Sequence, residues 1–270
     1  MRLLELFSGT GSIGRAFIEK GFEVVSVDID PKANATHTCN ILDWDCTVYP
    51  PDHFDVVWGS PPCTMYSRAR TTGGPRDLEG SDRLVAKTLE VIHYFNPRCW
   101  AFENVGTGLL PGRAVVAGIP CSFLTYCKYA DGDFPKYRKL TAVWHNLPWT
   151  PRPICCKASR CAHIIGDQHP VSAQRAPAKY GGVRRPTASD RMSLSTLYSM
   201  PPALCAELAE VCREACQNLA ANCAEVALEP LHAGPASHPE AIQLEVHRPL
   251  HEAHVGEDHN GNDQKRVAGH

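Results

Sequence analysis

The hydrophobic positions of this 270-residue chain fall into short apolar runs separated by amphipathic segments and polar turns. Apolar residues recur with helical spacing at Ile13, Phe17 and Ile18, and again between Leu84 and Phe95. The continuous runs have the length of strands that are buried on both faces of a sheet: Arg2–Phe7, Phe22–Val27, Phe54–Trp58, Cys99–Phe102 and Leu140–Trp144. Strands that alternate with helices predict an α/β fold with a parallel sheet.

The hydrophobic pattern changes twice after residue 144. Residues 145–191 show neither period and are crowded with Pro, Gly and Arg, and hydrophobicity falls sharply after about Leu228. Between them, a helical stripe predicts a helix that returns to the main domain: Leu204, Leu208, Val211, Ala215 and Leu219. We therefore divide the chain into a main domain over 1–144, a small lobe over 145–191, a C-terminal helix over 192–228 and a disordered tail over 229–270.

Charge is distributed unevenly along the chain. Residues 1–135 carry 12 Lys/Arg and 16 Asp/Glu, whereas residues 136–191 carry 11 Lys/Arg with only Asp167 and Asp190. The net charge of the whole chain is −2. A positive block of this kind usually faces a polyanion, with a solvated surface as the alternative.

The remaining composition limits the compartment. No run of eighteen apolar residues predicts a membrane span, and Met1–Phe7 is too short and too quickly charged for a signal peptide. Thirteen cysteines without disulfide spacing indicate a reducing compartment. We expect a soluble intracellular protein, cytoplasmic or nuclear, and no feature indicates an obligate protein partner.

The first predicted strand runs into a glycine turn, Gly9-Thr10-Gly11-Ser12-Ile13-Gly14, which matches G-x-G-x-x-G. The second predicted strand ends in Asp28, 19 residues after Gly9. The glycines let backbone approach a ligand, the following helix favours an anion at its N-terminus, and the acid can hold ribose hydroxyls. This unit predicts a nucleoside-containing cofactor, either NAD or S-adenosylmethionine.

Two reactive side chains stand where predicted strands end. Cys63 follows the run Phe54–Trp58 on a rigid Pro-Pro turn, and Glu103 directly follows Cys99–Phe102. Open α/β sheets place their ligands at the carboxyl ends of strands, and adjacent parallel strands would bring both side chains into one pocket. The alternatives are a small apolar residue at Cys63 and an acid that interacts with a helix dipole at Glu103.

Together these stretches resemble the cytosine-C5 DNA methyltransferase family over about residues 1–215. The segments that resemble its motifs are Leu6 to Gly11, Val27 to Asp30, the Pro-Cys nucleophile segment Gly59 to Ser67, and the Glu-Asn-Val segment Phe102 to Val105. Tyr126 to Tyr129 and Tyr137 to Lys139 look closest to short phage- and virus-type members.

The resemblance implies a Rossmann-like, S-adenosylmethionine-dependent methyltransferase fold with a catalytic domain over 1–144 and a target-recognition lobe over 145–191. It implies methyl transfer to C5 of cytosine in DNA through a covalent adduct of Cys63 at C6 of a flipped-out base. The catalytic residues it implies are Cys63, Glu103, Arg138 and Lys139, where Arg138 or Lys139 supplies the cation of a Gln-x-Arg-x-Arg motif that is not intact. The cofactor-binding residues it implies are Phe7, Gly9, Thr10, Gly11, Ser12, Ile13, Asp28, Ile29, Asn40, Ile41 and Pro61.

The chain departs from the family pattern at several positions. Thr64 follows the cysteine where Gln is usual, Asn40 stands where an acid commonly contacts adenine, and Ser199 to Pro202 occupies the region of a late Gly-Asn pair. Two alternatives therefore stay open: an RNA substrate, as in tRNA-methylating relatives, and a catalytically silent nucleic-acid-binding member. The positive segment does not separate DNA from RNA, because phosphates attract cations in both.

The lobe also contains a candidate zinc set. Its members are Cys155, Cys156, Cys161 and His163, with His169 further along the chain. The spacing Cys-x4-Cys-x-His is not one of the common zinc frames, and unpaired thiols are the alternative. A metal would make physical sense, because about 45 residues bury little core by themselves.

Overall fold

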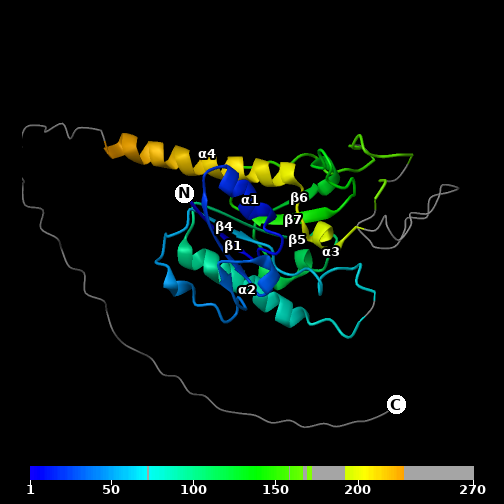
Figure 1. Cartoon of the computed structure of the whole chain (residues 1–270), viewed down its shortest axis with the longest axis horizontal. Coiled ribbons are helices and arrows are strands. Elements are labelled where there is room, and N and C mark those ends of the chain that lie inside the picture. Colours follow the sequence, from blue (N-terminus) through cyan, green and yellow to red (C-terminus); the bar gives the residue numbers. More distant parts are fainter. Residues whose placement is uncertain (72, 158, 167–168, 172–191, 228–270) are drawn as a thin grey trace, which may run out of the picture. The chain divides into compact units, whose positions relative to one another are not determined.

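The computed structural model describes the chain except for residues 72, 158, 167–168, 172–191 and 228–270 (Figure 1). The described residues belong to one unit, Met1–Leu228. The predicted tail over 229–270 and the second half of the predicted lobe therefore lie outside the described residues. Boundaries within this unit are given below as the structure has them.

A single mixed sheet organises the described part of the chain. Its strands are β1 (Arg2–Leu6), β2 (Glu23–Asp28), β3 (His37–Thr38), β4 (Val56–Gly59), β5 (Cys99–Val105), β6 (Cys121–Thr125) and β7 (Leu140–His145). They lie in the order β3-β2-β1-β4-β5-β7-β6. The pairs from β3 to β5 are parallel, and β7 runs antiparallel to both β5 and β6. The predicted α/β fold is confirmed, with a mixed sheet in place of a parallel one.

Helices cover both faces of this sheet (Figure 1). They are α1 (Ser12–Glu19), α2 (Leu78–Phe95), α3 (Leu194–Tyr198) and α4 (Pro202–Ala227), and short 3-10 turns are Pro31–Ala33, Cys46–Val48, Leu110–Gly112, Ala114–Val116 and Tyr126–Lys128. Successive strand residues point to opposite faces, so Leu3 packs in the core beneath α1 and α4 while Leu4 packs in the core beneath α2. Both faces of the central strands are buried, as their continuous apolar runs predict.

The hydrophobic pattern did not predict two of the strands, β3 and β6. β3 contains only two residues, and β6 reads Cys-Ser-Phe-Leu-Thr with Phe123 exposed at the edge of the sheet. An edge strand is not buried on both sides, so its sequence lacks the continuous apolar run by which the central strands are found. The antiparallel direction of β7 depends on the connection through β6, which no local pattern encodes.

The returning helix α4 buries a face that overlaps the stripe predicted for it and extends to its cysteines, with the side chain of Leu219 outside the described residues. Its buried residues are Leu204, Cys205, Leu208, Ala209, Cys212 and Cys216, whereas Val211 and Ala215 are only partly buried. Three of the four cysteines of this segment are thus small core residues that let α4 approach the sheet and α1 closely. The backbone carbonyl of Cys216 also accepts a hydrogen bond from the Arg98 guanidinium at 2.8 Å.

The described helices include none that combines the length and apolar character needed to cross a membrane.

Candidate active site

The loop that carries Cys63 starts where β4 ends. A Cβ at Gly59 would lie 2.9 Å from Thr88, so only glycine lets the strand end this close to α2. The carbonyl of Cys63 then accepts hydrogen bonds from the amides of Tyr66 at 3.1 Å and Ser67 at 2.8 Å. This turn holds the half-buried Cys63 just beyond the carboxyl end of a central strand.

Asn104 links the Cys63 loop to the neighbouring strand β5. It is fully buried, and its side-chain amide donates to the carbonyl of Pro61 at 3.0 Å. Its side-chain oxygen accepts from the amide of Val105 at 2.9 Å. Asn104 is therefore a positioning residue for the loop. Its place directly after Glu103 in the Glu-Asn-Val segment was the available sequence signal, but the sequence analysis did not assign it a role.

A second anchor lies just after the cysteine. Tyr66 is fully buried, and its hydroxyl donates to Asp82 of α2 at 2.8 Å. Asp82 also accepts from the Arg113 guanidinium at 2.9 Å, while Arg76 donates to the carbonyl of Met65. The loop between β4 and α2 is therefore held at two points, by Asp82 through Tyr66 and by Arg76 through Met65.

Glu103 lies on β5, the parallel neighbour of β4, with Phe102 in register with Gly59. Burial raises the pKa of the Cys63 thiol, and the negative charge of Glu103 raises it further, whereas the positive charge of Lys139 lowers it. Cys63, Glu103 and Lys139 are thus close enough to interact electrostatically, although they lie far apart in the sequence.

The surroundings of Lys139 are aromatic. Its ammonium lies 4.7 Å from the ring centroid of Tyr126 and 3.5 Å from that hydroxyl. Among the described residues, neither the buried Oε2 of Glu103 nor the buried hydroxyl of Tyr137 has a hydrogen-bond partner. Unpaired polar atoms in a buried site are costly, so both atoms are available for a polar ligand.

The structure separates the two cations that the sequence proposed for one role. The charge of Lys139 acts on Cys63, whereas Arg138 is exposed and donates from Nε to the carbonyl of Cys155 at 2.9 Å. Arg138 therefore belongs to the contact with the lobe.

A cavity of about 410 Å³ lies beside the Cys63 loop. Five of the predicted cofactor residues line it: Phe7, Asp28, Ile29, Asn40 and Ile41. Pro62, Thr64 and Met65 bring the Cys63 loop to its wall, and Ser81, Arg83 and Leu84 come from the start of α2. Sequence reasoning missed the α2 residues, because only the packing of α2 against the sheet brings them to the cavity. Pro61 is buried beneath this wall and is held by Asn104.

The segment from Phe7 through the glycine turn has unusual backbone. Gly9 and Gly11 have positive φ, and so does Phe7 at 58°, a conformation that costs a non-glycine residue about 1–2 kcal/mol. The amides of Phe7 and Ser8 both donate to the carbonyl of Val27, at 2.8 and 3.3 Å. Backbone strain of this kind concentrates at ligand sites, and Phe7 lines the cavity.

Asp28 is joined to the glycine turn. Its carboxylate accepts from the amide of Gly9 at 2.7 Å and from the amide of Asp30 at 2.8 Å. In the same turn, the hydroxyls of Thr10 and Ser12 lie 2.8 Å apart. The Ser12 hydroxyl also accepts from the amide of Met200 at 3.3 Å.

The other predicted cofactor positions, Gly9, Thr10, Gly11, Ser12, Ile13 and Pro61, are not among the residues that line the cavity. The side chain of Ile13 is buried in the core beneath α1 and α4. Asn40 does line the cavity, and its side-chain oxygen accepts from the amide of Leu42 at 3.1 Å.

Glu5 supports the same turn from beneath, and sequence reasoning missed it. Burial raises its pKa to about 7, although hydrogen bonds from the amides of Gly14 and Ile13 and the charge of Arg15 act in the lowering direction. These amides belong to the first turn of α1, whose N-cap residue, Gly11, has no side chain to accept them. An acid inside an otherwise apolar strand, just ahead of a glycine turn, was the available signal.

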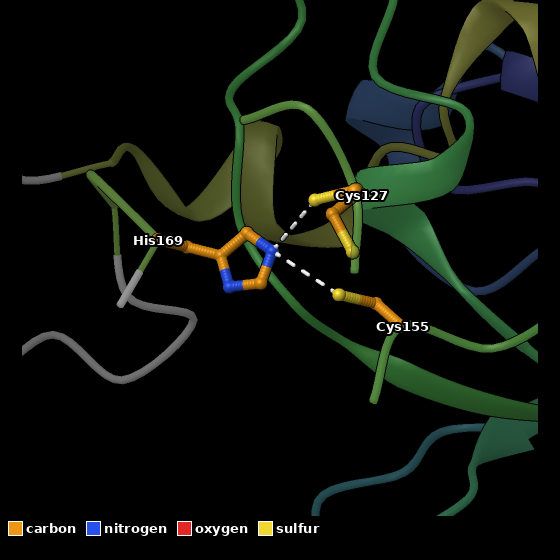
Figure 2. Close-up of side chains that lie close together, drawn as sticks. Cys127, Cys155 and His169 are labelled. Atoms are coloured by element: carbon orange, nitrogen blue, oxygen red, sulfur yellow. Dashed lines mark hydrogen bonds between the residues drawn. The ribbon is translucent and has the colours of Figure 1, made fainter. Parts of the chain in front are cut away.

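The cysteine cluster of the lobe has a different composition from the predicted one. The donor atoms of Cys127, Cys155, Cys161 and His169 all lie within 4.8 Å of one another. Figure 2 shows the side chains of Cys127, Cys155 and His169 pointing toward a common centre. Cys156 is exposed, and it and His163 do not belong to this group. The predicted set is corrected at two positions, because Cys127 comes from the main domain and no spacing within the lobe reveals it.

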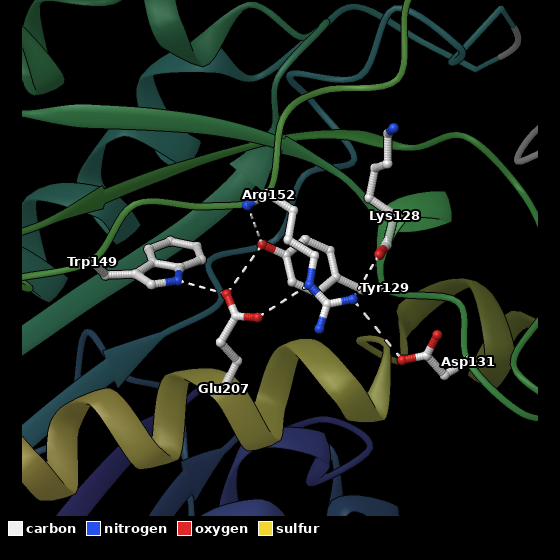
Figure 3. Close-up of polar contacts among 6 residues, drawn as sticks. All are labelled: Lys128, Tyr129, Asp131, Trp149, Arg152 and Glu207. Atoms are coloured by element: carbon white, nitrogen blue, oxygen red, sulfur yellow. Dashed lines mark hydrogen bonds and ion pairs between the residues drawn. The ribbon is translucent and has the colours of Figure 1, made fainter. Parts of the chain in front are cut away.

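One cation of the positive segment is engaged inside the protein. The Arg152 guanidinium contacts Glu207 of α4 at 3.2 Å and lies 4.4 Å from the ring centroid of Tyr129 (Figure 3). Glu207 also accepts from the indole of Trp149 at 2.8 Å and from the hydroxyl of Tyr129 at 3.3 Å. Arg152 therefore fastens the start of the lobe to α4, which makes it a poor candidate for a phosphate contact.

Comparisons with known proteins agree with the motifs. The family model described as C-5 cytosine-specific DNA methylase matches residues 1–112. Over 228 residues the chain is 31% identical to "Probable DNA (cytosine-5)-methyltransferase" of Frog virus 3 (isolate Goorha), covering 78% of this chain and 100% of that protein.

Two bacterial proteins are also similar. The chain is 33% identical to "Type II methyltransferase M.AgeI" of Thalassovita gelatinovora over 62% of this chain and 46% of that protein. It is 27% identical to "Type II methyltransferase M.AquIA" of Picosynechococcus sp. over 75% of this chain and 90% of that protein. The chain thus spans the full length of the viral relative and about half of M.AgeI.

Proposed function

The chain belongs to the family of C-5 cytosine-specific DNA methylases, and we propose that it transfers a methyl group from S-adenosylmethionine to C5 of cytosine in DNA, with Cys63 as the nucleophile. The observation that carries this proposal is that Cys63, in the loop after β4, interacts electrostatically with Lys139 and with Glu103 of the adjacent strand β5, whose buried Oε2 has no partner among the described residues. The cavity lined by Asp28 opens beside the same loop. A nucleophile, an acid and a cation next to a cofactor-sized cavity are the parts that this chemistry needs.

Cys63 supplies the covalent step. Carbon 5 of cytosine is too weak a nucleophile to accept a methyl group unaided, and addition of a thiolate at C6 makes C5 electron-rich. Once C5 carries the methyl group, its proton leaves to a solvent base, the bond between sulfur and C6 breaks, and the Cys63 thiolate is released. Because burial raises the pKa of Cys63, the thiolate needs a nearby cation, and Lys139 lowers that pKa. Asn104 contributes indirectly, since it holds the loop through Pro61.

Glu103 stabilises the charge that develops on the ring during this addition. A protonated Glu103 donates to N3 of the base, which removes the need for full negative charge there. Its unpartnered Oε2 fits such a ligand contact. The hydroxyl of Tyr137 offers a further donor to the polar edge of the base.

The cavity beside this pocket suits S-adenosylmethionine. At about 410 Å³ it falls within the usual range of small-molecule sites, and its lining combines apolar side chains with the Asp28 carboxylate. Asp28 would bind the ribose hydroxyls, Phe7 and Ile29 would contact the adenine, and the glycine turn would hold the methionine part. When bound there, the cofactor would supply an electrophilic methyl group on the side of the cavity formed by the Cys63 loop.

Nucleic acid would reach this pocket from the side of the lobe. The target base must leave the double helix, because its C5 and C6 atoms cannot be reached inside the stack. Lys157 is an exposed cation of the lobe, unlike Arg152, and is the better candidate for a phosphate contact. We favour DNA over RNA because the relatives that the chain resembles are named as DNA methyltransferases.

Transfer of a labelled methyl group to duplex DNA, single-stranded DNA and RNA, measured side by side, tests the proposal. We expect transfer to DNA by the wild type and none by Cys63→Ser, while both bind S-adenosylmethionine with similar affinity in calorimetry. Glu103→Gln should lower the rate by roughly 10²–10⁴-fold, the usual contribution of a general acid. Cys156→Ser is the matched control, because this thiol is exposed and lies outside the pocket.

A DNA duplex with 5-fluorocytosine at the target position should trap a covalent complex through Cys63, since fluorine cannot leave from C5 as a proton does. Normal methylation by Cys63→Ser would overturn the mechanism. Transfer to RNA alone would keep the chemistry and change the substrate. Binding of DNA without any transfer would favour a silent member of the family.

A further inference from the structure

We propose that Cys127, Cys155, Cys161 and His169 bind one structural zinc ion that fastens the lobe to the catalytic domain. The observation is the convergence of three thiols and one imidazole, whose donor atoms all lie within 4.8 Å of one another (Figure 2). In addition, Nε2 of His169 lies 3.1 Å from Sγ of Cys161 and 3.8 Å from Sγ of Cys155. The methylation chemistry uses none of these four residues.

The donor set selects the metal. Three thiolates and one imidazole form a set that zinc binds in a closed tetrahedron, whereas calcium and magnesium prefer oxygen ligands. With zinc–sulfur bonds of about 2.3 Å, the sulfur atoms of such a tetrahedron lie roughly 3.8 Å apart. The cluster therefore needs to contract by no more than about an ångström to hold the ion. Four protein ligands leave no open position, so the site would be structural and not catalytic.

The backbone around the cluster is already arranged for this role. Cys127 lies in the 3-10 turn after β6, and the amide of Cys155 donates to the hydroxyl of Thr125 at 2.9 Å. The ammonium of Lys128 contacts the hydroxyl of Ser159 at 3.1 Å and the carbonyl of Arg160 at 3.2 Å. These bonds hold the loop that carries Cys155 and Cys161 against the turn that carries Cys127.

The lobe has a physical need for such a fastening. Between β7 and α3 the described residues form no helix or strand, so few backbone hydrogen bonds hold this segment together. Cys127 and Cys155 are nevertheless 1% and 2% exposed. Ordering the lobe costs conformational entropy, and its small apolar core cannot offset this cost alone. The binding free energy of a metal that joins two distant segments can offset it. Three thiol protons would leave to solvent as the ion binds.

The site lies next to the segment that carries the pocket cation. Arg138 contacts the carbonyl of Cys155, and Tyr137 pairs with Val171, two residues beyond His169. Lys139 follows Arg138 directly in the chain. The zinc ion would thus hold the lobe. It would also hold the segment just before β7, which carries Lys139, the cation that acts on Cys63. The site itself depends only on the four donor atoms of the cluster, so its failure would leave the proposed methyl transfer untouched.

Metal analysis of the purified full-length protein tests the proposal. After expression in zinc-supplemented medium and desalting, we expect one zinc per chain by mass spectrometry of the metal content. Cys127→Ser, Cys161→Ser and His169→Ala should each lose it, and in competition with a chelator their affinity should fall by more than the 10- to 100-fold typical of changes behind a ligand. Cys156→Ser and His163→Ala are matched controls from the same loop and should keep it.

A second measurement uses the wild type, so it tests the site even if the ligand variants fail to fold. Wild-type protein stripped of zinc and loaded with cobalt(II) should show the visible absorption of a tetrahedral thiolate site, and zinc should displace that spectrum one for one. The same spectrum should form in Cys156→Ser. The proposal is overturned if the wild type binds neither metal stoichiometrically, if another metal occupies the site, if a disulfide joins two of the three cysteines, or if the controls lose zinc as the ligand variants do.

Discussion

Replacing Glu5 by Gln should change how the stability of the protein depends on pH. Glu5 is 4% exposed, on the strand that leads into the glycine turn, and the amides of Gly14 and Ile13 donate to it. Burial raises its pKa from the ordinary 4.5 to about 7, and Asp28 adds to the rise while Arg15 opposes it. The folded protein therefore holds this proton more tightly than the unfolded chain does.

The sign of the effect follows from proton linkage. A carboxyl whose pKa is higher in the folded state stabilises the fold fully below the unfolded pKa of 4.5, and this contribution is lost as the pH rises through about 7. At about 1.4 kcal/mol per pH unit, the interval between the two pKa values corresponds to roughly 3 kcal/mol. Of this, roughly 2–3 kcal/mol is lost between pH 5 and pH 8.

Glu5→Gln keeps an oxygen that can accept from the amides but does not ionise. The free energy of unfolding of the variant, minus that of the wild type, should therefore rise by roughly 2–3 kcal/mol from pH 5 to pH 8. Urea unfolding at several pH values measures this difference directly. In thermal unfolding the same change should appear as roughly 5–10 °C.

Glu19→Gln is the control, because Glu19 is an exposed acid on α1, the helix that Glu5 supports. Its stability should follow the wild type across the same pH range. Parallel curves for Glu5→Gln and the wild type would refute the reasoning, since they would mean that Glu5 ionises in the folded protein as it does in the unfolded chain.

Three further substitutions test the proposed site. Asp28→Ala should weaken S-adenosylmethionine binding by roughly ten- to a hundredfold, because a hydrogen bond to a charged acceptor contributes about 1.5–3 kcal/mol; unchanged affinity in calorimetry would contradict the placement of the cofactor. Asn104→Ala should cost about 1–3 kcal/mol in urea unfolding, because it leaves the carbonyl of Pro61 without its buried donor. The same variant should lower the turnover rate while the affinity for S-adenosylmethionine stays within about twofold, and a normal rate would show that the loop does not depend on this bond. Lys139→Met removes the charge that lowers the pKa of Cys63, so the pH–rate profile of methyl transfer should move to higher pH. A profile that stays in place would mean that Lys139 does not act on the thiol.

Much of the fold could be predicted from the sequence because its central strands are buried on both faces. Such strands read as continuous apolar runs, and the runs Arg2–Phe7, Phe22–Val27 and Phe54–Trp58 correspond to β1, β2 and β4. The resemblance to short viral members of the family is confirmed by the match to the Frog virus 3 protein along its full length. The motifs that carried this resemblance are local, so one chain was enough to find them.

Local pattern also located the end of β4, and with it Cys63, which lies in the loop after that strand. A residue that directly follows a buried strand lies at the edge where ligands bind, whichever neighbours that strand has. Glu103 was expected directly after its strand, but β5 extends to Val105, so Glu103 lies within β5, the parallel neighbour of β4.

Only the tertiary structure decided which side chains meet from distant parts of the chain. Lys139 and not Arg138 acts on Cys63, because Arg138 is held at the carbonyl of Cys155. Cys127 joins the cysteine cluster in place of Cys156, and of the two candidate histidines His169 and not His163 belongs to it, since the turn after β6 packs against the lobe. Glu5 receives its raised pKa from the helix and sheet that cover it. Periodicity reports which face of one element is buried, but it carries no information about which other element covers that face, and these contacts depend on that pairing.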